Sequence, residues 1–309
     1  MNLINKLSDF IGKKEVKDTL QVYIDACNKL NKPLDHCLLY GLPGTGKTTL
    51  AKIIANELNT KIKITQGSMV QKPIDVINLL LSLNQNEILF IDEIHAVNKQ
   101  CFELFYSAME EGYVDIAIGK DFNSKMARIK LPVFTLIAAT TNLGKIPQPL
   151  EDRFGIFINM SEYSKTEISD IIKFYGNKLG VIFSDDDLLT LIYASKGIPR
   201  IAYKLVRRAL DFRLNNKDIQ MSEILSKLGI IYEGIDKNDY SYLKLLQNHS
   251  TPIGLKTISQ TINIDEETIQ YKIEPYLLKN EYIIKTSKGR KLTNKGNELI
   301  IKINQLFLK

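Results

Sequence analysis

The stretch Gly-Leu-Pro-Gly-Thr-Gly-Lys-Thr at residues 41–48 follows a short apolar run, Cys-Leu-Leu-Tyr, at residues 37–40. A strand, a turn of the form G-x-x-x-x-G-K-[S/T] and a helix in this order are typical of a phosphate-binding loop. The glycines let successive N–H groups point at a phosphate, and the helix N-terminus adds its positive dipole end. We predict that Lys47 binds the β- and γ-phosphates and that the Thr48 hydroxyl ligates Mg²⁺. The other nucleotide-binding candidates of the loop are Gly44, Gly46 and Thr49.

A second motif, Glu-Ile-Leu-Phe-Ile-Asp-Glu at residues 87–93, supplies the acidic groups that such a site needs. Four apolar residues in a row favour a strand buried on both faces. Asp92 and Glu93 then lie at its C-terminal end, where open parallel sheets bind ligands. We predict that Asp92 shares the Mg²⁺ with Thr48 and that Glu93 polarises the attacking water. A turn that binds nothing and an acidic helix N-cap are the alternatives, and both motifs would then be coincidental.

Composition limits the class of protein. The 309 residues are 44% hydrophobic and 25% charged, as expected for two or three globular domains. No stretch approaches the roughly 18 apolar residues of a membrane span, and the N-terminus lacks a signal-peptide core, so we expect a cytoplasmic protein without a membrane partner. Cys27, Cys37 and Cys101 are scattered, which favours buried thiols in a reducing compartment and no metal site beyond Mg²⁺.

The order of strands and helices predicts three domains. Strands expected at residues 62–65, 88–91, 134–140 and 156–160 alternate with helical stretches, which favours a parallel sheet covered on both faces. Only helical periodicity follows for about seventy residues. We therefore predict an α/β domain over residues 1–160, a small helical domain over residues 161–234 and a last domain over residues 235–309.

The last domain combines a helix-turn-helix pattern with a basic hairpin. We expect helices at residues 242–247, 255–261 and 266–279, with Pro275 limiting the third, and then a hairpin over residues 282–293. This order predicts a winged helix. Residues 285–309 carry seven basic residues and one acid, a net charge of +6 that equals the charge of the whole chain. Such a segment indicates a nucleic-acid partner, and a solvated basic tail is the alternative.

Spacing alone allows two interpretations for each of two further features, a hairpin and an arginine. Residues 114–118 alternate strictly and residues 126–131 are strand-like, so they predict a hairpin around residues 119–125 that either packs on its own domain or projects. Arg200 lies in the first turn of a helix expected at residues 199–212, where a cation opposes the helix dipole. A nearby phosphate would explain this arginine, and an ordinary surface arginine is the alternative.

Taken in order, these motifs resemble the RuvB family of AAA+ ATPases, the bacterial motors of Holliday-junction branch migration. The resemblance begins near Leu7 and rests on the phosphate loop and the following segments: Asp-His at 35–36, Asp-Glu-Ile-His at 92–95, Ala-Ala-Thr-Thr at 138–141, Asp-Arg-Phe-Gly-Ile at 152–156, Gly-Ile-Pro-Arg-Ile-Ala at 197–202, Glu-Pro-Tyr-Leu at 274–277 and Lys-Gly-Arg at 288–290. It implies an AAA+ core, a helical lid and a winged-helix domain.

The resemblance also implies roles that spacing alone does not assign. Arg153 matches the arginine finger that enters a neighbouring subunit's site, Arg200 the sensor-2 arginine of the lid, and Thr141 the sensor-1 residue near the attacking water. Lys285 and Arg290 match wing positions that contact DNA. Further residues implied at the nucleotide are Phe10, Ile11, Glu110, Glu111, Gly112 and Tyr163. The inserted hairpin matches the element that docks on RuvA, and its apolar residues are Val114, Ile116, Ile118 and Ile129.

The resemblance thus implies an ATP-driven DNA helicase or translocase: a homohexameric ring that binds ATP and Mg²⁺ and promotes branch migration with RuvA. Recombination, DNA repair and the SOS response to DNA damage would be its setting, and a RuvC-type resolvase is a further candidate partner. Two other functions stay open. One is a clamp-loader-like AAA+ switch, and the other is a DNA-binding regulator for which ATP is only a conformational ligand.

Overall fold

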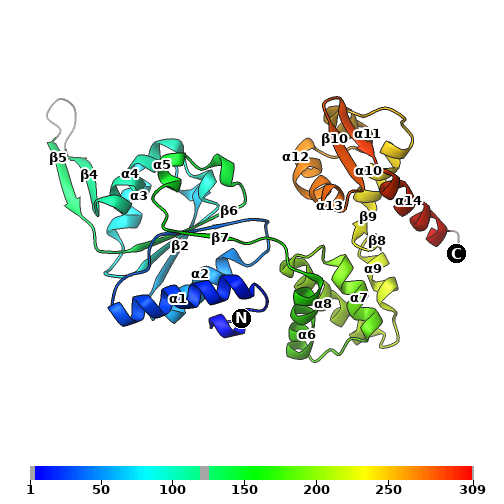
Figure 1. Cartoon of the computed structure of the whole chain (residues 1–309), viewed down its shortest axis with the longest axis horizontal. Helices are drawn as coiled ribbons and strands as arrows, with labels where there is room; N and C mark the ends of the chain where they lie inside the picture. The colour runs from blue at the N-terminus through cyan, green and yellow to red at the C-terminus, as the bar shows by residue number, and fades with distance from the viewer. Residues whose placement is uncertain (1–3, 119–124, 308–309) are drawn as a thin grey trace. The chain divides into compact units, whose positions relative to one another are not determined.

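A parallel sheet of five strands is the centre of the first half of the chain (Figure 1). The computed structural model describes residues 4–118 and 125–307 and forms two units, Met1–Glu167 and Ile168–Lys309. In spatial order the strands are β2 (Ile62–Gln66), β3 (Ile88–Asp92), β6 (Thr135–Thr140), β1 (Cys37–Tyr40) and β7 (Ile156–Asn159). All neighbouring strands are parallel, so their carboxyl ends meet at one edge. The predicted α/β core is confirmed.

Helices cover both faces of the sheet, because successive residues of a strand point to opposite faces. Leu39 belongs to the core formed with α1 (Lys14–Leu30) and α2 (Lys47–Glu57). Leu38, one residue earlier, belongs to the core formed with α3 (Pro73–Leu81), α4 (Phe102–Glu110) and α5 (Gln148–Glu151). Figure 1 shows these two groups of helices on either side of the sheet. The continuous apolar runs of β1 and β3 follow from this double burial.

The inserted hairpin extends from the end of α4 (Figure 1). It consists of β4 (Tyr113–Ile118) and β5 (Lys125–Lys130), paired antiparallel. Val114 is fully buried in the core of its own domain, and Ile116 and Ile129 pack partly against that core. The prediction that Val114 faces a partner is therefore corrected: it anchors the base of the hairpin. Residues 119–124 of the turn predicted at 119–125, and the Ile118 side chain, lie outside the described residues.

The second unit begins with four helices, as helical periodicity predicts. Most of α6 (Lys165–Leu179) belongs to it, followed by α7 (Asp185–Ala194), α8 (Pro199–Asn215) and α9 (Met221–Lys227). Capping boxes start α6 and α7: Ser164 and Glu167 bond each other's backbone N–H groups, as do Ser184 and Asp187. These bonds satisfy N–H groups that a helix start leaves without an intrahelical partner.

The predicted winged helix is present in the same unit. It contains α10 (Lys237–Gln247), α11 (Leu255–Ile262), and the hairpin β10 (Ile283–Thr286) with β11 (Gly289–Leu292). A last helix, α14 (Asn294–Phe307), was not predicted. Its residues Leu299, Ile300 and Ile303 lie in the domain core, so the basic C-terminal segment is mostly folded and is not a solvated tail.

The third helix of this domain corrects the prediction for Pro275. α12 (Glu266–Thr268) continues into a π-helical turn (Ile269–Ile273) and then into α13 (Glu274–Lys279), with Pro275 in the first turn of α13. Proline carries no N–H and fits the first turn of a helical segment. The wider π turn lets the chain pass this position. Pro275 therefore begins a segment, and the prediction that it limits the helix was wrong.

The three cysteines are free thiols. Cys37 and Cys101 are buried and Cys27 is half-buried, and burial raises the pKa of each thiol. Within residues 4–118 and 125–307, no helix combines the length and the apolar character that a membrane span requires.

Candidate functional site

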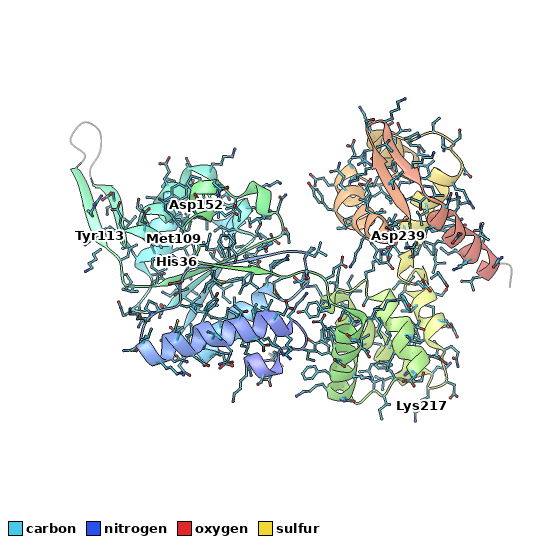
Figure 2. All side chains as sticks on the ribbon, in the orientation of Figure 1. His36, Met109, Tyr113, Asp152, Lys217 and Asp239 are labelled. Carbon is cyan, nitrogen blue, oxygen red and sulfur yellow. The ribbon has the colours of Figure 1, made fainter. Side chains whose placement is uncertain are left out.

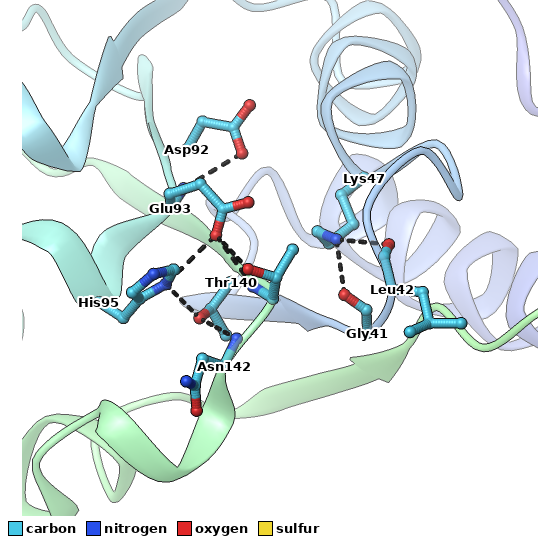
Figure 3. Close-up of polar contacts among 9 residues, drawn as sticks. Gly41, Leu42, Lys47, Asp92, Glu93, His95, Thr140 and Asn142 are labelled. Atoms are coloured by element: carbon cyan, nitrogen blue, oxygen red, sulfur yellow. Dashed lines mark hydrogen bonds and ion pairs between the residues drawn. The ribbon is translucent and has the colours of Figure 1, made fainter. Parts of the chain in front are cut away.

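The phosphate loop joins β1 to α2 at the carboxyl edge of the sheet. Gly46 precedes α2 with a φ of 103°, in the left-handed region that favours glycine. A Cβ atom at this position would also lie 3.2 Å from the Phe10 ring, so the loop passes close to that ring. Lys47 Nζ donates to the carbonyls of Gly41 and Leu42 at 2.8 and 2.9 Å (Figure 3). The ammonium group therefore lies on the loop itself, where it can exchange these carbonyls for phosphate oxygens.

The predicted pair of Mg²⁺ ligands is brought together. Thr48 Oγ1 donates to Asp92 Oδ2 at 2.9 Å, across the gap between the start of α2 and the end of β3. The other carboxylate oxygen of Asp92 accepts from the N–H of Glu93 at 3.1 Å. A hydroxyl and a carboxylate oxygen facing each other beside a phosphate loop are the oxygen donors that Mg²⁺ prefers. The residues present therefore fit a magnesium nucleotide.

Glu93 is held in an uncommon backbone conformation with its carboxylate fixed. Its φ and ψ are 51° and 52°, in the left-handed region, which costs a non-glycine residue on the order of 1 kcal/mol or more. Its Oε2 atom accepts hydrogen bonds from the N–H and the hydroxyl of Thr141 at 3.0 and 2.9 Å. Thr141 follows β6, the strand beside β3, so adjacent strand ends place the predicted base and sensor together.

Sequence reasoning assigned no role to two residues of this site. His95 Nδ1 lies 3.2 Å from Glu93 Oε2 and 2.9 Å from Thr140 Oγ1 (Figure 3). The same hydroxyl accepts from the N–H of Asn142 at 3.0 Å. These contacts fix the turn that carries Thr141. The motifs around His95 and Thr140 were visible in the sequence, but spacing along the chain does not reveal a contact between two strand ends.

The segment before α1 closes one side of the phosphate loop. Phe10 is 4% exposed and packs under Gly46, and Ile11 beside it is half-buried. Tyr163 is buried and donates its hydroxyl to the carbonyl of Thr45 at 3.0 Å. The N–H of Lys13 donates to Glu167 at 2.6 Å, which ties this segment to the chain after β7. Phe10 and Tyr163 thus support the loop, and their contacts with a nucleotide stay predictions.

The predicted arginine finger lies at the amino ends of the strands, and the phosphate loop lies at their carboxyl ends. Arg153 precedes β7, whereas the phosphate loop follows β1, and these two strands pair in parallel. Four strand residues separate the two edges by about 13 Å. Arg153 instead contacts its own domain: its guanidinium is 2.6 Å from Glu110 and 4.9 Å from the centre of the Tyr106 ring. This placement suits a residue that serves a neighbouring subunit's site.

Glu111 and Gly112 follow Glu110 at the end of α4. Glu111 lies 3.5 Å from Arg128 of the hairpin, and Gly112 has a φ of 69° where the chain turns into β4. Of the three residues 110–112, Glu110 is the one that pairs with Arg153. Their approach to a nucleotide stays a prediction.

Comparisons with known proteins place the chain in one family. Residues 4–160 match the family description "Holliday junction DNA helicase RuvB P-loop domain", and residues 232–301 match "RuvB C-terminal winged helix domain". The chain belongs to the RuvB family. It is therefore a P-loop ATPase, as the loop and the acidic pair predict.

RuvB relatives align along nearly the whole chain. The Holliday junction branch migration complex subunit RuvB of Ureaplasma urealyticum serovar 10 is 46% identical over 97% of this chain and 96% of that protein. The same subunit of Mycoplasma genitalium is 45% identical over 96% of this chain and 97% of that protein. The solved structure of the Thermotoga maritima RuvB Holliday junction branch migration motor is 34% identical, covers 97% of this chain and 98% of its own, and has a TM-score of 0.84.

The RuvB resemblance places Arg200 at the nucleotide, and the structure locates it within the second unit. It is exposed in the first turn of α8, directly after Pro199. An exposed cation at a helix N-terminus has no stabilising partner in the helix dipole. Its contact with a phosphate stays a prediction.

The two predicted DNA-binding residues share a partner that the sequence did not reveal. Glu274 is fully buried, and its carboxylate lies 2.7 Å from Arg290 Nε and 2.6 Å from Lys285 Nζ. Tyr242 also donates to it at 3.0 Å. Burial alone would raise the pKa of Glu274, but the hydrogen bonds from Arg290 and Lys285 outweigh burial and lower it. Arg290 is 15% exposed and Lys285 is 46% exposed, so Lys285 is the more accessible of the two to DNA.

Proposed function

We propose that this protein is the ATP-driven motor that moves Holliday junctions along duplex DNA in recombination and DNA repair. The observation that carries the proposal is the hydrolytic set at the sheet edge: Glu93 fixed by Thr141, beside the Asp92–Thr48 pair. A regulator that only binds ATP has no need of a positioned general base. The RuvB family match over both the ATPase and winged-helix domains connects this chemistry to a junction.

At the ATP site each residue has a separate task. Lys47 binds the β- and γ-phosphates, and Thr48 and Asp92 hold Mg²⁺, which neutralises charge that develops on the phosphates. Glu93 accepts the proton of the attacking water as the bond between the γ-phosphorus and the bridging oxygen breaks. Thr141 keeps the carboxylate aimed, so little reorganisation is required during the reaction. Arg200 on the lid contacts the nucleotide and links its state to the angle of the lid.

The site requires a second subunit. Arg153 lies at the amino ends of the strands of its own sheet, away from its own phosphate loop. It completes the site of a neighbour in a homohexameric ring. To do so, its guanidinium has to exchange Glu110 for the γ-phosphate, which is also an anion. Arginine fingers are worth about 10³–10⁵ in turnover, so assembly and activity are coupled.

DNA contact and recruitment use the two elements outside the ATPase core. The wing carries Lys285 and contacts the phosphate backbone of duplex DNA, which suits a motor that must move along any sequence. The β4–β5 hairpin docks on RuvA, which brings the ring to the junction. The reaction takes place in the cytoplasm, and a RuvC-type resolvase acts on the moved junction.

The test is a branch-migration assay with the full-length protein, ATP, Mg²⁺, RuvA and a synthetic four-way junction. We expect branch migration to separate the junction into two duplexes only when ATP is present. We also expect ATP turnover to rise when junction DNA is added. ATP turnover without junction movement would favour the clamp-loader-like switch. Tight ATP binding without turnover would favour the regulator.

A further inference from the structure

The Asp-His pair at residues 35–36 precedes β1 and has no role in the chemistry described above. The His36 ring is half-buried and packs against the Phe134 ring, with the ring centres 5.4 Å apart. Its Nδ1 accepts the N–H of Leu136 at 2.8 Å, so that nitrogen carries no proton. The backbone of Met109 also lies near the ring, where it opposes part of the lowering of the His36 pKa by burial. His36 therefore bonds β6 and lies near the end of α4, where Figure 2 labels it beside Met109.

The backbone of the same pair holds the loop that carries the arginine finger. The carbonyl of His36 accepts the N–H groups of Gly155 and Ile156 at 3.0 and 3.1 Å. A Cβ atom added to Gly155 would lie 3.1 Å from Cβ of Asp35, tighter than most side-chain contacts. Gly155 is only two residues after Arg153. The finger is thus tied to Asp35 and His36 through a short stretch of chain.

The contacts of His36 lie next to both partners of the ion pair between Arg153 and Glu110. Met109, whose backbone lies near the His36 ring, precedes Glu110. Gly155, whose N–H donates to the His36 carbonyl, follows Arg153 by two residues. The guanidinium and the Glu110 carboxylate are 2.6 Å apart. A cavity of about 510 Å³ lies among His36, Met109, Glu110, Arg153 and Gly155. Phe154 anchors the loop in the core, and the hydrogen bonds of His36 add a second constraint on the residues that flank it.

We propose that Asp35 and His36 are positioning residues for the arginine finger: they fix the loop of Arg153 and the end of α4, and so determine where the guanidinium enters the neighbouring subunit's ATP site. The inference rests on the proposed function, because it needs a finger that acts between subunits. A purely structural role, closing the amino end of the sheet, would instead weaken the domain and its own ATP site.

The test asks which ATP site a His36 variant impairs. A positioning role impairs the site of the neighbouring subunit, whereas a purely structural role impairs the variant's own site. His36→Asn keeps an acceptor near the position of Nδ1 but is too short to reach Met109. We expect the full-length variant to bind ATP with unchanged affinity and to lose about 100-fold in junction-stimulated turnover, the effect of roughly 1 Å of misplacement. Mixed with Lys47→Ala subunits, which have an intact finger and no working ATP site, it should regain turnover. Mixed with Arg153→Ala subunits, which lack a finger, it should not.

Three results would overturn the positioning role: weakened ATP binding, no recovery with Lys47→Ala, or recovery with Arg153→Ala. A failure of the proposed function is recognised separately, because Arg153→Ala mixed with Lys47→Ala then shows no recovery either.

Two more variants guard against a folding defect. Thr135→Val removes the nearby hydrogen bond to the carbonyl of Leu34 without touching the finger loop, and we expect a lower Tm with normal turnover. If this control shows the same loss and recovery as His36→Asn, the proposal fails. Gly155→Ala disturbs the contact from the other side, against Asp35, and should reproduce the recovery with Lys47→Ala. Normal turnover of Gly155→Ala would contradict the proposal.

Discussion

At the scale of single residues, the ATP site depends on a few side chains held in uncommon positions. Glu93 keeps a left-handed backbone and accepts two hydrogen bonds from Thr141. Such strain persists where surrounding contacts compensate it, and His95 and Thr140 supply part of that support here. The residue types at these positions were predictable from motifs. The contacts among them were not, because they join the ends of two strands separated by 48 residues along the chain.

Removing the charge of Glu93 tests its role as general base. Glu93→Gln keeps the size of the side chain and can keep a bond with the Thr141 hydroxyl, so we expect normal ATP binding. Turnover should fall by about 10²–10⁴, the usual contribution of general-base catalysis. Nucleotide affinity and single-turnover hydrolysis measure the two effects. Hydrolysis at the normal rate would show that another group activates the water.

His36 gives a pH dependence to stability that can be isolated. Burial lowers its pKa below the ordinary 6.5, so the unfolded chain takes up a proton at a higher pH than the folded chain does. The contribution to stability is complete above about pH 6.5 and is lost as the pH falls below it, by up to about 1.4 kcal/mol per pH unit.

We therefore expect His36→Asn to reduce the loss of unfolding free energy between pH 7.5 and 5.5, measured by urea titration. His249→Asn, at an exposed position of the winged helix, is the matched variant with which the slope of His36→Asn is compared. An equal slope in wild type and His36→Asn would contradict the burial argument.

At the scale of elements, the strands and most helices followed from periodicity because each covers one face of a core. The strand predictions agree with the observed bounds to within one residue for β1, β2, β3, β6 and β7. The errors have local causes. Pro275 fits the first turn of α13 after a π turn, and α14 was obscured by its polar residues although Leu299, Ile300 and Ile303 keep a helical spacing.

The wing carries two cations that pair with Glu274: Arg290, which is mostly buried, and Lys285, which is accessible. Arg290→Ala leaves the buried Glu274 with one charged partner fewer, and we expect a loss of roughly 1.5–3 kcal/mol in stability of the winged helix. Lys285 is about half exposed, so Lys285→Ala should cost under ~1 kcal/mol. It should instead lower the salt dependence of duplex binding by about one unit of slope.

Thermal unfolding and DNA titrations at several salt concentrations measure both effects. Lys288→Ala at the exposed wing tip is a useful comparison, since Lys288 lies outside the ion pairs made with Glu274. An unchanged salt slope in Lys285→Ala would remove this lysine from the DNA interface. An undiminished stability of Arg290→Ala would show that Glu274 finds another partner.

At the scale of the whole molecule, the proposed function depends on contacts between copies of the chain. The phosphate loop lies at the carboxyl ends of the strands and Arg153 at their amino ends. In the proposed ring, a single subunit therefore holds two halves of different sites. The phosphate loop was predictable from its own motif, whereas the role of Arg153 was implied only by the family resemblance. The sequence did not predict that Arg153 rests on Glu110, since that contact forms between residues 43 positions apart.

The most direct test of the shared site is the junction-stimulated ATP turnover of mixtures of Arg153→Ala and Lys47→Ala subunits. Each variant alone should be nearly inactive. In random rings, an intact ATP site meets an intact finger at about one interface in four when the two are equimolar, so turnover should rise to about a quarter of the wild-type value. Turnover that stays near zero at every mixing ratio would contradict an ATP site completed by the neighbouring subunit.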